Sequence, residues 1–344
     1  MSDMPLDRAE LIRRLGLTAA AAAVPGARAA FAEDSPNFLR PHPEWRFVFV
    51  NHAKTNPFFV PTRYGIQDAC SLLGTSYRWT GSIRSDVGEM LVAMRRAIRE
   101  KADGIAVSVI EPKAFDKPTA EALDRGIPVI AYNADGSRSN ARLAYVGQDL
   151  YQSGLKFGAR IAALVGEGRV FIFIATPGQL NIQPRVDGAF DAIKDSGKPI
   201  YATVVATGPE VRREKARIES TFLRHKGLRG MFAVDGGSTQ GVAEVMRKYG
   251  LHKRGVRAGG YDLLPATLRA IAEGHLDFTI DQQPYLQGFL PTLQLFFAKY
   301  SGGLVAPADT NTGLLFVTRK NVRRYITTRT RYEGSSSHRE FPVT

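Results

Sequence analysis

The chain contains a single cysteine, Cys70, among its 344 residues. One thiol can form neither an internal disulfide nor a multi-thiolate zinc site. The six histidines are scattered without an HExxH motif or any paired spacing, so the sequence holds no metal-site pattern. We therefore expect no metal and no cofactor. Burial of apolar residues, which make up an ordinary 44% of the chain, has to stabilise the fold.

Nucleotide-binding and hydrolase motifs are also missing. The glycine-rich stretch Asp235–Gly241 lacks the Gly-Lys-Ser/Thr end of a phosphate-binding loop and does not fit GxGxxG. There is no GxSxG motif, and no Ser, His and Asp can be assigned to a catalytic triad. A nucleotide site is therefore not expected and acyl-transfer chemistry has no positive evidence; we expect that the protein is not an enzyme.

Positive charge is in excess, with 46 Lys and Arg against 33 Asp and Glu and a net charge of +13. A basic surface raises the question of a nucleic-acid partner. However, the charge is spread out, no run of five basic residues occurs, and the densest stretch lies between Arg319 and Arg331. We interpret this stretch as a solvated basic tail and expect no nucleic-acid partner.

Long apolar runs are absent except near the start, where Arg13-Arg14 precede an apolar stretch over residues 15–25. That length is typical of an export signal and well short of the ~20 residues that span a bilayer. Small residues at Ala30 and Ala32 predict a signal over residues 1–32 with cleavage after Ala32. The arginine pair favours the twin-arginine route, but the full consensus is missing and the route stays open. An amphipathic first helix of a cytosolic protein fits the alanine-rich stretch less well.

The rest of the chain alternates short apolar runs with helical patterns. Strands are predicted at 46–51, 76–80, 104–108 and 127–132, and again at 169–175, 200–206, 230–234, 256–261 and 276–280. Helices of the second series are predicted at 150–165, 185–195, 210–224, 238–249 and 264–273. Nearly continuous apolar strands are typical of parallel sheets covered on both faces. The predicted fold is α/β, with two Rossmann-like doubly wound lobes in tandem.

In such sheets ligands bind beyond the carboxyl ends of the strands. Polar side chains follow the predicted strand ends, and one arginine stands at a helix start: Asn51, Asn56, Asn133, Asp135, Asp235, Asp262, Gln282 and Arg185. Amides, carboxylates and a guanidinium supply paired donors and acceptors that suit vicinal hydroxyl groups. Phe58 and Phe59 supply apolar faces for the C–H groups of a ring. The set predicts a polyhydroxylated ligand.

Seven short motifs occur in one order: Asn56-Pro57-Phe58-Phe59, 101–107, 126–130, 146–149, 185–190, 259–262 and 279–284. Each motif by itself is weak evidence for a protein family, but all seven in this order are strong evidence. Over residues 45 to 300 the sequence resembles the ribose-type family of periplasmic sugar-binding proteins, the type I substrate-binding proteins of ABC transporters.

The resemblance implies a pocket between the lobes, lined by Asn56, Phe58, Phe59, Asn133, Arg185, Asp235, Asp262 and Gln282. Asn133 stands where many members carry Asp, and Asp235 stands where Asn is common. This exchange of an amide and a carboxylate puts ribose itself in doubt. Asn51, Trp79 and Asp135 are further candidate contacts.

The resemblance also implies a three-segment hinge, with crossings near 146–149, 282–283 and 308–312. The amino-terminal lobe then takes residues 45–147 plus 283–309. The carboxy-terminal lobe takes 148–282 plus 310–344, including the basic tail.

Ordinary structural roles compete with several of these assignments. Asp262 could only cap the helix that follows it, and Asn133 could only cap a turn. Arg185 could be a surface residue, while one of Phe58 and Phe59 could be a core contact. Trp79 at a strand end is more often core or rim than ligand contact.

We therefore expect a monomeric periplasmic protein that closes on a sugar or sugar alcohol and delivers it to an ABC permease in the inner membrane. A ligand-sensing partner of a membrane chemoreceptor or kinase stays open as an alternative. A lactose-repressor type regulator shares the fold, but the residues before the first strand read as a signal and not as a DNA-binding domain. The sequence does not choose among pentoses, hexoses, inositols and alditols.

Overall fold

The computed structural model describes residues 41–225, 227–327 and 330–334. The described residues from Glu44 onward belong to one compact unit, and the export signal expected at 1–32 lies outside the described residues. Within the described part of the chain, none of the helices has the length and apolarity needed to cross a membrane.

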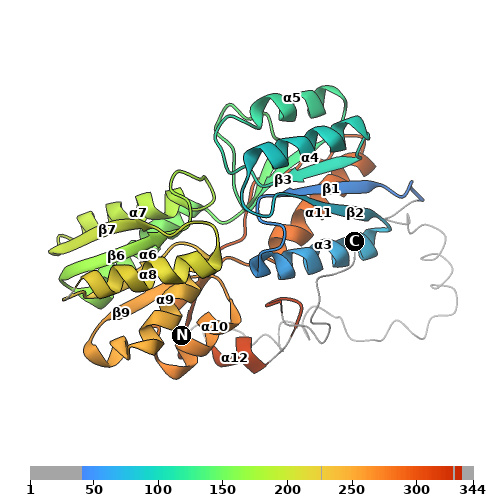
Figure 1. The fold of residues 1–344 in the computed structure, drawn as a ribbon. Coiled ribbons are helices and arrows are strands. Elements are labelled where there is room, and N and C mark those ends of the chain that lie inside the picture. The colour runs from blue at the N-terminus through green and yellow to red at the C-terminus, as the bar shows by residue number, and fades with distance from the viewer. Residues whose placement is uncertain (1–40, 226, 328–329, 335–344) are drawn as a thin grey trace, which may run out of the picture. The chain divides into compact units, whose positions relative to one another are not determined.

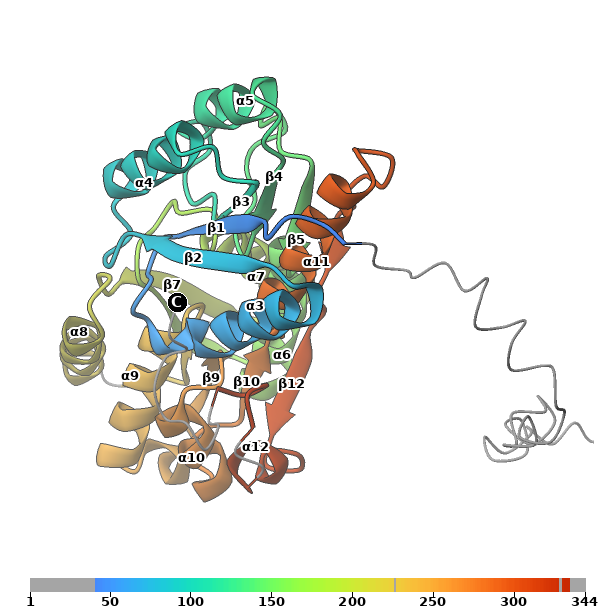
Figure 2. The same cartoon turned by 90° about the vertical axis from the view of Figure 1, so that its right-hand side faces the viewer.

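The first lobe is built on a six-stranded parallel sheet with the order β11-β5-β4-β3-β1-β2. Its strands are β1 (Arg46–Asn51), β2 (Ser76–Gly81), β3 (Gly104–Val107), β4 (Val129–Tyr132), β5 (Ala144–Gly147) and β11 (Thr310–Asn311). Helices α3 (Val60–Leu73) and α11 (Leu286–Tyr300) cover one face, and α4 (Val87–Arg99) and α5 (Asp116–Asp124) cover the other (Figures 1 and 2).

The second lobe repeats this plan with the order β12-β10-β9-β8-β6-β7, in which only the β10–β12 pair is antiparallel. Its strands are β6 (Gly168–Ile174), β7 (Ile200–Ala206), β8 (Gly230–Ala233), β9 (Arg257–Tyr261), β10 (Phe278–Asp281) and β12 (Leu315–Thr318). One face carries α6 (Leu150–Val165) and α7 (Gln183–Asp195). The other carries α8 (Val211–Arg224), α9 (Gly236–Lys248) and α10 (Pro265–Glu273), with α12 (Arg323–Thr327) beside α10.

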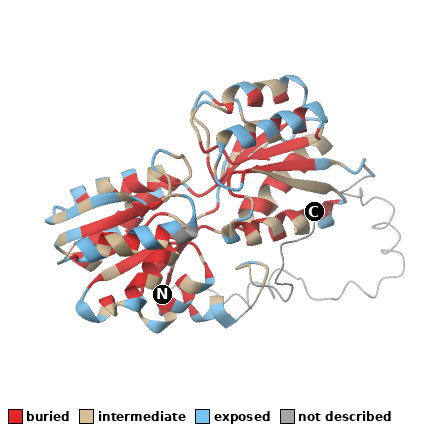
Figure 3. Ribbon diagram, viewed as in Figure 1, coloured by how far each residue is buried: buried red, intermediate tan, exposed pale blue. Residues whose placement is uncertain are grey.

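Burial explains why these elements form. Phe47 to Val50 of β1 are fully buried, as expected for a strand covered on both faces, and Figure 3 shows the central strands in red. Asp86 caps α4, because its carboxylate accepts a hydrogen bond from the Glu89 N–H. The Glu89 carboxylate in turn accepts a hydrogen bond from Ser82 Oγ at 2.7 Å.

The chain crosses between the sheets three times. The crossings follow β5 at Gly147, β10 at Asp281 and β11 at Asn311, close to the expected positions. One boundary needs correction, because Thr310 and Asn311 pair with β5 in the first sheet and do not belong to the second. Gln282 stands in the second crossing and Gln148 in the first. Gln148 Nε2 donates a hydrogen bond to Gly313 O at 3.1 Å, and this bond connects the first crossing to the third.

The described part of the basic tail also departs from expectation. Arg331 forms an ion pair with Asp68 of α3, and the Tyr332 ring packs edge-on against Tyr285 with centroids 4.8 Å apart. Residues 330–334 therefore contact the first lobe, whereas the resemblance implies that 310–344 belong to the second.

Candidate sugar site

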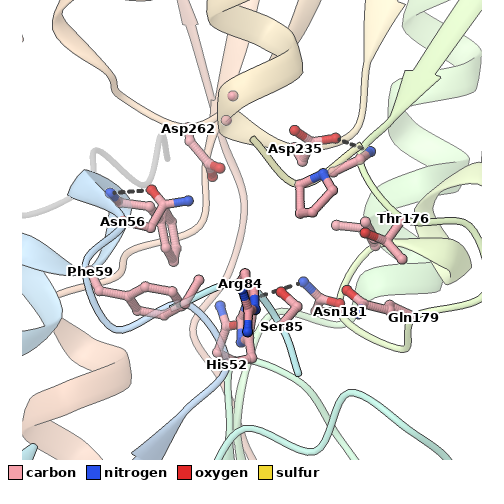
Figure 4. Close-up of a pocket in the computed structure, with 18 of the residues that line it drawn as sticks. His52, Asn56, Phe59, Arg84, Ser85, Thr176, Gln179, Asn181, Asp235 and Asp262 are labelled. Atoms are coloured by element: carbon pink, nitrogen blue, oxygen red, sulfur yellow. Dashed lines mark hydrogen bonds between the residues drawn. The ribbon is translucent and has the colours of Figure 1, made fainter. Parts of the chain in front are cut away.

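A cavity of about 240 Å³ lies at the carboxyl ends of the strands and is lined from both lobes (Figure 4). The structure brings together all the principal residues that the sequence singled out: Asn56, Phe58, Phe59, Asn133, Arg185, Asp235, Asp262 and Gln282. The convergence follows from topology, because parallel strands end at the same edge of a sheet. The volume is below the 300–1,000 Å³ usual for drug-sized ligands, so a small molecule fits it.

The first-lobe wall is an aromatic cluster at the start of α3. Asn56 caps the short 3-10 helix Pro57–Phe59 and its Oδ1 accepts a hydrogen bond from Phe58 N at 3.0 Å. Phe59 is 1% exposed and packs edge-on against Phe58 and against His52. Phe59 is therefore also a core residue, while the less buried Phe58 retains free apolar surface at the cavity.

Arg185 is the buried cation of the second-lobe wall. It stands in the first turn of α7 and is 2% exposed. Its Nη1 donates to Val234 O at 2.8 Å, and its guanidinium lies over the Tyr261 ring, 4.1 Å from the centroid. Its Nε is buried without a hydrogen-bond partner among the described residues. A buried unpaired donor is costly.

Asp262 follows β9 in the left-handed backbone region, with φ of 76°. It is 6% exposed, and its Oδ1 accepts a hydrogen bond from Gln282 Nε2 at 2.7 Å. Burial raises the pKa of its carboxyl to about 6, and the charge of Arg185 acts in the opposite direction. Asp262 is not a helix cap, because the N-cap of α10 is Leu264.

Asp235 does cap a helix. Its Oδ1 accepts from Ser238 N and its Oδ2 accepts from Ala175 N, each at 2.8 Å. These bonds hold the carboxylate at the start of α9. Each carboxylate oxygen can accept more than one hydrogen bond, so Asp235 can still accept from a ligand.

Asn133 connects the cavity to the hinge. It adopts a left-handed conformation with φ of 63°, and its Nδ2 donates to Gln287 Oε1 at 3.0 Å. Gln287 Nε2 in turn donates to Gln282 O at 3.0 Å, and Thr312 Oγ1 donates to the same carbonyl at 2.9 Å. A chain of buried hydrogen bonds thus links both walls to two of the three crossings.

The three further candidates do not line the cavity. Asn51 is fully buried and bonds to Ala53 N and Tyr132 Oη. Trp79 packs on Phe59 and donates to Lys54 O. Asp135 forms an ion pair with Arg142. In each case a protein partner holds the side chain elsewhere.

The cavity also contains residues that the sequence reasoning missed: His52, Arg84, Ser85, Thr176, Gln179, Asn181 and Glu214. His52 and Thr176 follow strands β1 and β6, so the strand-end rule could have found them. Glu214 is inside helix α8, where no local signal marks it.

The two walls touch at the cavity. Asn181 Nδ2 lies 3.3 Å from His52 Nε2, and Leu180 N donates to Ile110 O at 3.0 Å. Burial lowers the pKa of His52 to about 4, so its ring is neutral at pH 7 and Nε2 can accept from the amide. Nδ1 then donates to Ser108 Oγ, 2.9 Å away.

Comparisons with known proteins agree with this architecture. The family described as "Periplasmic binding protein domain" matches residues 47–296. The xylose/arabinose-binding protein XylF of Sulfolobus acidocaldarius is 54% identical over 310 residues, which are 86% of this chain and 76% of that protein. The D-allose-binding periplasmic protein of Escherichia coli is 25% identical over 275 residues, 76% of this chain and 87% of that protein.

A solved structure shows the same fold with a sugar bound. The solute-binding protein of an ABC transporter from Burkholderia graminis C4D1M, in complex with D-arabinose, superposes with a TM-score of 0.77. The two sequences are 26% identical, and the match covers 85% of this chain and 100% of the Burkholderia protein chain. The family predicted from the ordered motifs is confirmed, and with it the two-lobed α/β fold: the chain belongs to the periplasmic binding protein family.

Proposed function

We propose that the protein binds a pentose such as xylose or arabinose in the interlobe cavity and delivers it to the permease of an ABC importer. The observation that carries this proposal is the 54% identity to a xylose/arabinose-binding protein over 86% of the chain. The small polar cavity with an aromatic wall supports it, because one sugar ring presents hydroxyl groups at its rim and C–H groups on its faces.

Delivery to a permease requires export, so we include in the proposal a signal at residues 1–32, a periplasmic location and a monomeric state. The match to a periplasmic binding protein family supports the location. No catalytic step is part of the proposal, and the relatives are named as binding proteins.

Binding would be coupled to closure of the lobes. Arg185 and Asp262 stand on one wall, and Asn56 and Phe58 stand on the other. A ligand that bonds to both walls interacts fully only when they are close, and this difference in affinity shifts the population to the closed state. The hydrogen bonds that join Gln282, Gln287 and Thr312 lie at the crossings where the rotation would occur.

Isothermal titration calorimetry with xylose, arabinose, ribose, glucose and allose tests the proposal. We expect the tightest binding with a pentose. Arg185→Ala should weaken that binding by at least about 2 kcal/mol, or about 30-fold, because it strands buried ligand oxygens. The control is Arg125→Ala, which removes an exposed arginine outside the cavity. Absence of binding to every pentose, or equal affinity in the Arg185→Ala variant, would contradict the proposal.

A further inference from the structure

Glu214 is a buried acidic residue with no role in the site so far. It lies inside α8, yet its side chain is only 3% exposed and lines the cavity. Its Oε2 accepts a hydrogen bond from Ser238 Oγ at 2.9 Å. The carboxyl lies against Gly237, where an added Cβ would be 2.5 Å from Oε1. The glycine therefore leaves the space that the carboxyl occupies, and a substituted residue would exclude it.

Glu214 and Asp235 form a carboxyl pair at the start of α9. Asp235 already accepts from Ser238 N and Ala175 N, but burial outweighs these bonds and raises the pKa of its carboxyl. Burial and the nearby charge of Asp235 raise the pKa of Glu214 to about 9. At neutral pH the Glu214 carboxyl is consequently protonated and has an O–H to donate.

Other charged groups face the pair from the elements packed around it. Arg185 of α7 and Asp262 after β9 line the same cavity, and Gly236 lies close to the Asp262 carboxyl. The neighbours of Glu214 on α8 are paired elsewhere, with Arg213 bonded to Glu210 and Lys215 bonded to Glu244 of α9. The positive charge of Arg185 also acts on Asp262, where it partly offsets the rise in pKa that burial causes.

We propose that Glu214 is a specificity-determining residue of the sugar site, where it acts with Asp235 as a carboxyl pair that holds one hydroxyl group of the ligand. The inference rests on the proposed function. A hydroxyl group both donates and accepts, and the O–H of Glu214 together with the carboxyl oxygens of the pair offers it a donor and acceptors. A sugar that lacks this hydroxyl leaves the pair without its partner, which is the arrangement that discriminates most strongly between substrates.

The test compares wild type with Glu214→Gln and Glu214→Ala. A carboxamide keeps the shape, one donor and one acceptor of the protonated carboxyl, so Glu214→Gln should bind the preferred pentose within about threefold of wild type at pH 7. Glu214→Ala should bind at least about 10-fold more weakly. Glu210→Gln is the matched control, because it changes the charge of an exposed glutamate at the start of the same helix. Circular dichroism and thermal melts establish that each variant is folded.

Two further measurements separate a ligand contact from a structural role. Wild-type affinity should fall above pH 9, where Glu214 loses its proton, whereas Glu214→Gln should show no such fall. In a series of single-deoxy pentoses, the analogue that wild type rejects should bind to Glu214→Ala about as well as the pentose itself.

The outcomes are distinguishable. If wild type binds no sugar, the proposed function fails and this inference fails with it. If wild type binds a pentose but Glu214→Ala matches its affinity, or Glu214→Gln follows the same alkaline profile, only the role of Glu214 is overturned.

Discussion

At the scale of single residues, the protonation of Asp262 should set the acid limit of binding. Its carboxylate accepts from Gln282 and is held beside Arg185, so a sugar hydroxyl that donates to it needs the ionised form. With a pKa of about 6, above the ordinary 3.8, this form dominates above pH 6 and is lost below it. His52, with a pKa of about 4, stays neutral throughout that range.

We predict that pentose affinity, measured by calorimetry in one buffer series, falls about 10-fold for each pH unit below 6. Asp262→Asn should bind at least about 10-fold more weakly at pH 7, because it loses a charge-assisted hydrogen bond, and its affinity should be flat between pH 5 and 7. Asp149→Asn, a helix cap outside the cavity, serves as the control. A wild-type affinity that stays constant from pH 7 to 5 would exclude Asp262 as an ionised acceptor.

At the scale of elements, the contact between α6 and α7 positions Arg185. Glycines on these helices allow the backbones to approach closely: a Cβ at Gly154 would lie 2.5 Å from Arg185 O, and one at Gly158 would lie 2.4 Å from Ala189 O. Added methyl groups in such a contact force the helices apart. The first turn of α7, where Arg185 stands, is the part that Gly154 contacts.

We predict that Gly154→Ala and Gly158→Ala each lower the free energy of unfolding by about 1–3 kcal/mol, as measured by denaturant titration. Gly154→Ala should in addition weaken pentose binding several-fold, since it displaces Arg185. Gly158→Ala, one helical turn away, is the matched control and should keep most of the affinity. Equal affinities in the two variants would mean that this contact does not position the guanidinium.

At the scale of the whole molecule, closure depends on the crossings and on the amides that join them. Gln287 is fully buried on α11 and bonds to Asn133, Gln282 and Thr312. It thereby connects a residue of the first-lobe wall to two crossings. A buried network of this kind is costly to interrupt, because the partners left behind lose their hydrogen bonds.

We predict that small-angle scattering of wild type shows a smaller radius of gyration with saturating pentose than without it. Gln287→Met keeps the length of the side chain and removes the amide, and it should lower unfolding free energy by about 1–3 kcal/mol and weaken pentose binding. Gln294→Met, which removes an amide bonded to Ala308 on the more exposed side of the same helix, should change neither property by much. A radius that is unaffected by ligand would contradict closure.

Much of the fold followed from local patterns. The predicted strand at 46–51 and helix at 150–165 have the observed bounds of β1 and α6. Continuous apolar strands and a regular helical period are properties of neighbouring residues, so a sequence shows them directly. Most of the predicted residues that meet at the cavity were found for a related reason: they come after strand ends, and parallel topology brings strand ends together.

Other features depend on contacts between distant residues. The two-residue strand β11 forms by pairing with β5, and its sequence Thr-Asn carries no strand pattern. Asn51, Trp79 and Asp135 follow the same strand-end rule as Asn133, but Tyr132, Lys54 and Arg142 hold them away from the cavity. Conversely, Glu214 reaches the cavity from inside a helix because Gly237 leaves it room.

The sequence by itself therefore determined most of the secondary structure, the family and the edge of the sheets where the proposed site lies, since these depend on residue periodicity and on motif order. Only the tertiary structure decided which polar side chains face the cavity and which are bound elsewhere. That choice depends on the partner each side chain meets, and those partners, such as Gln287 for Asn133 or Asp68 for Arg331, come from distant parts of the chain.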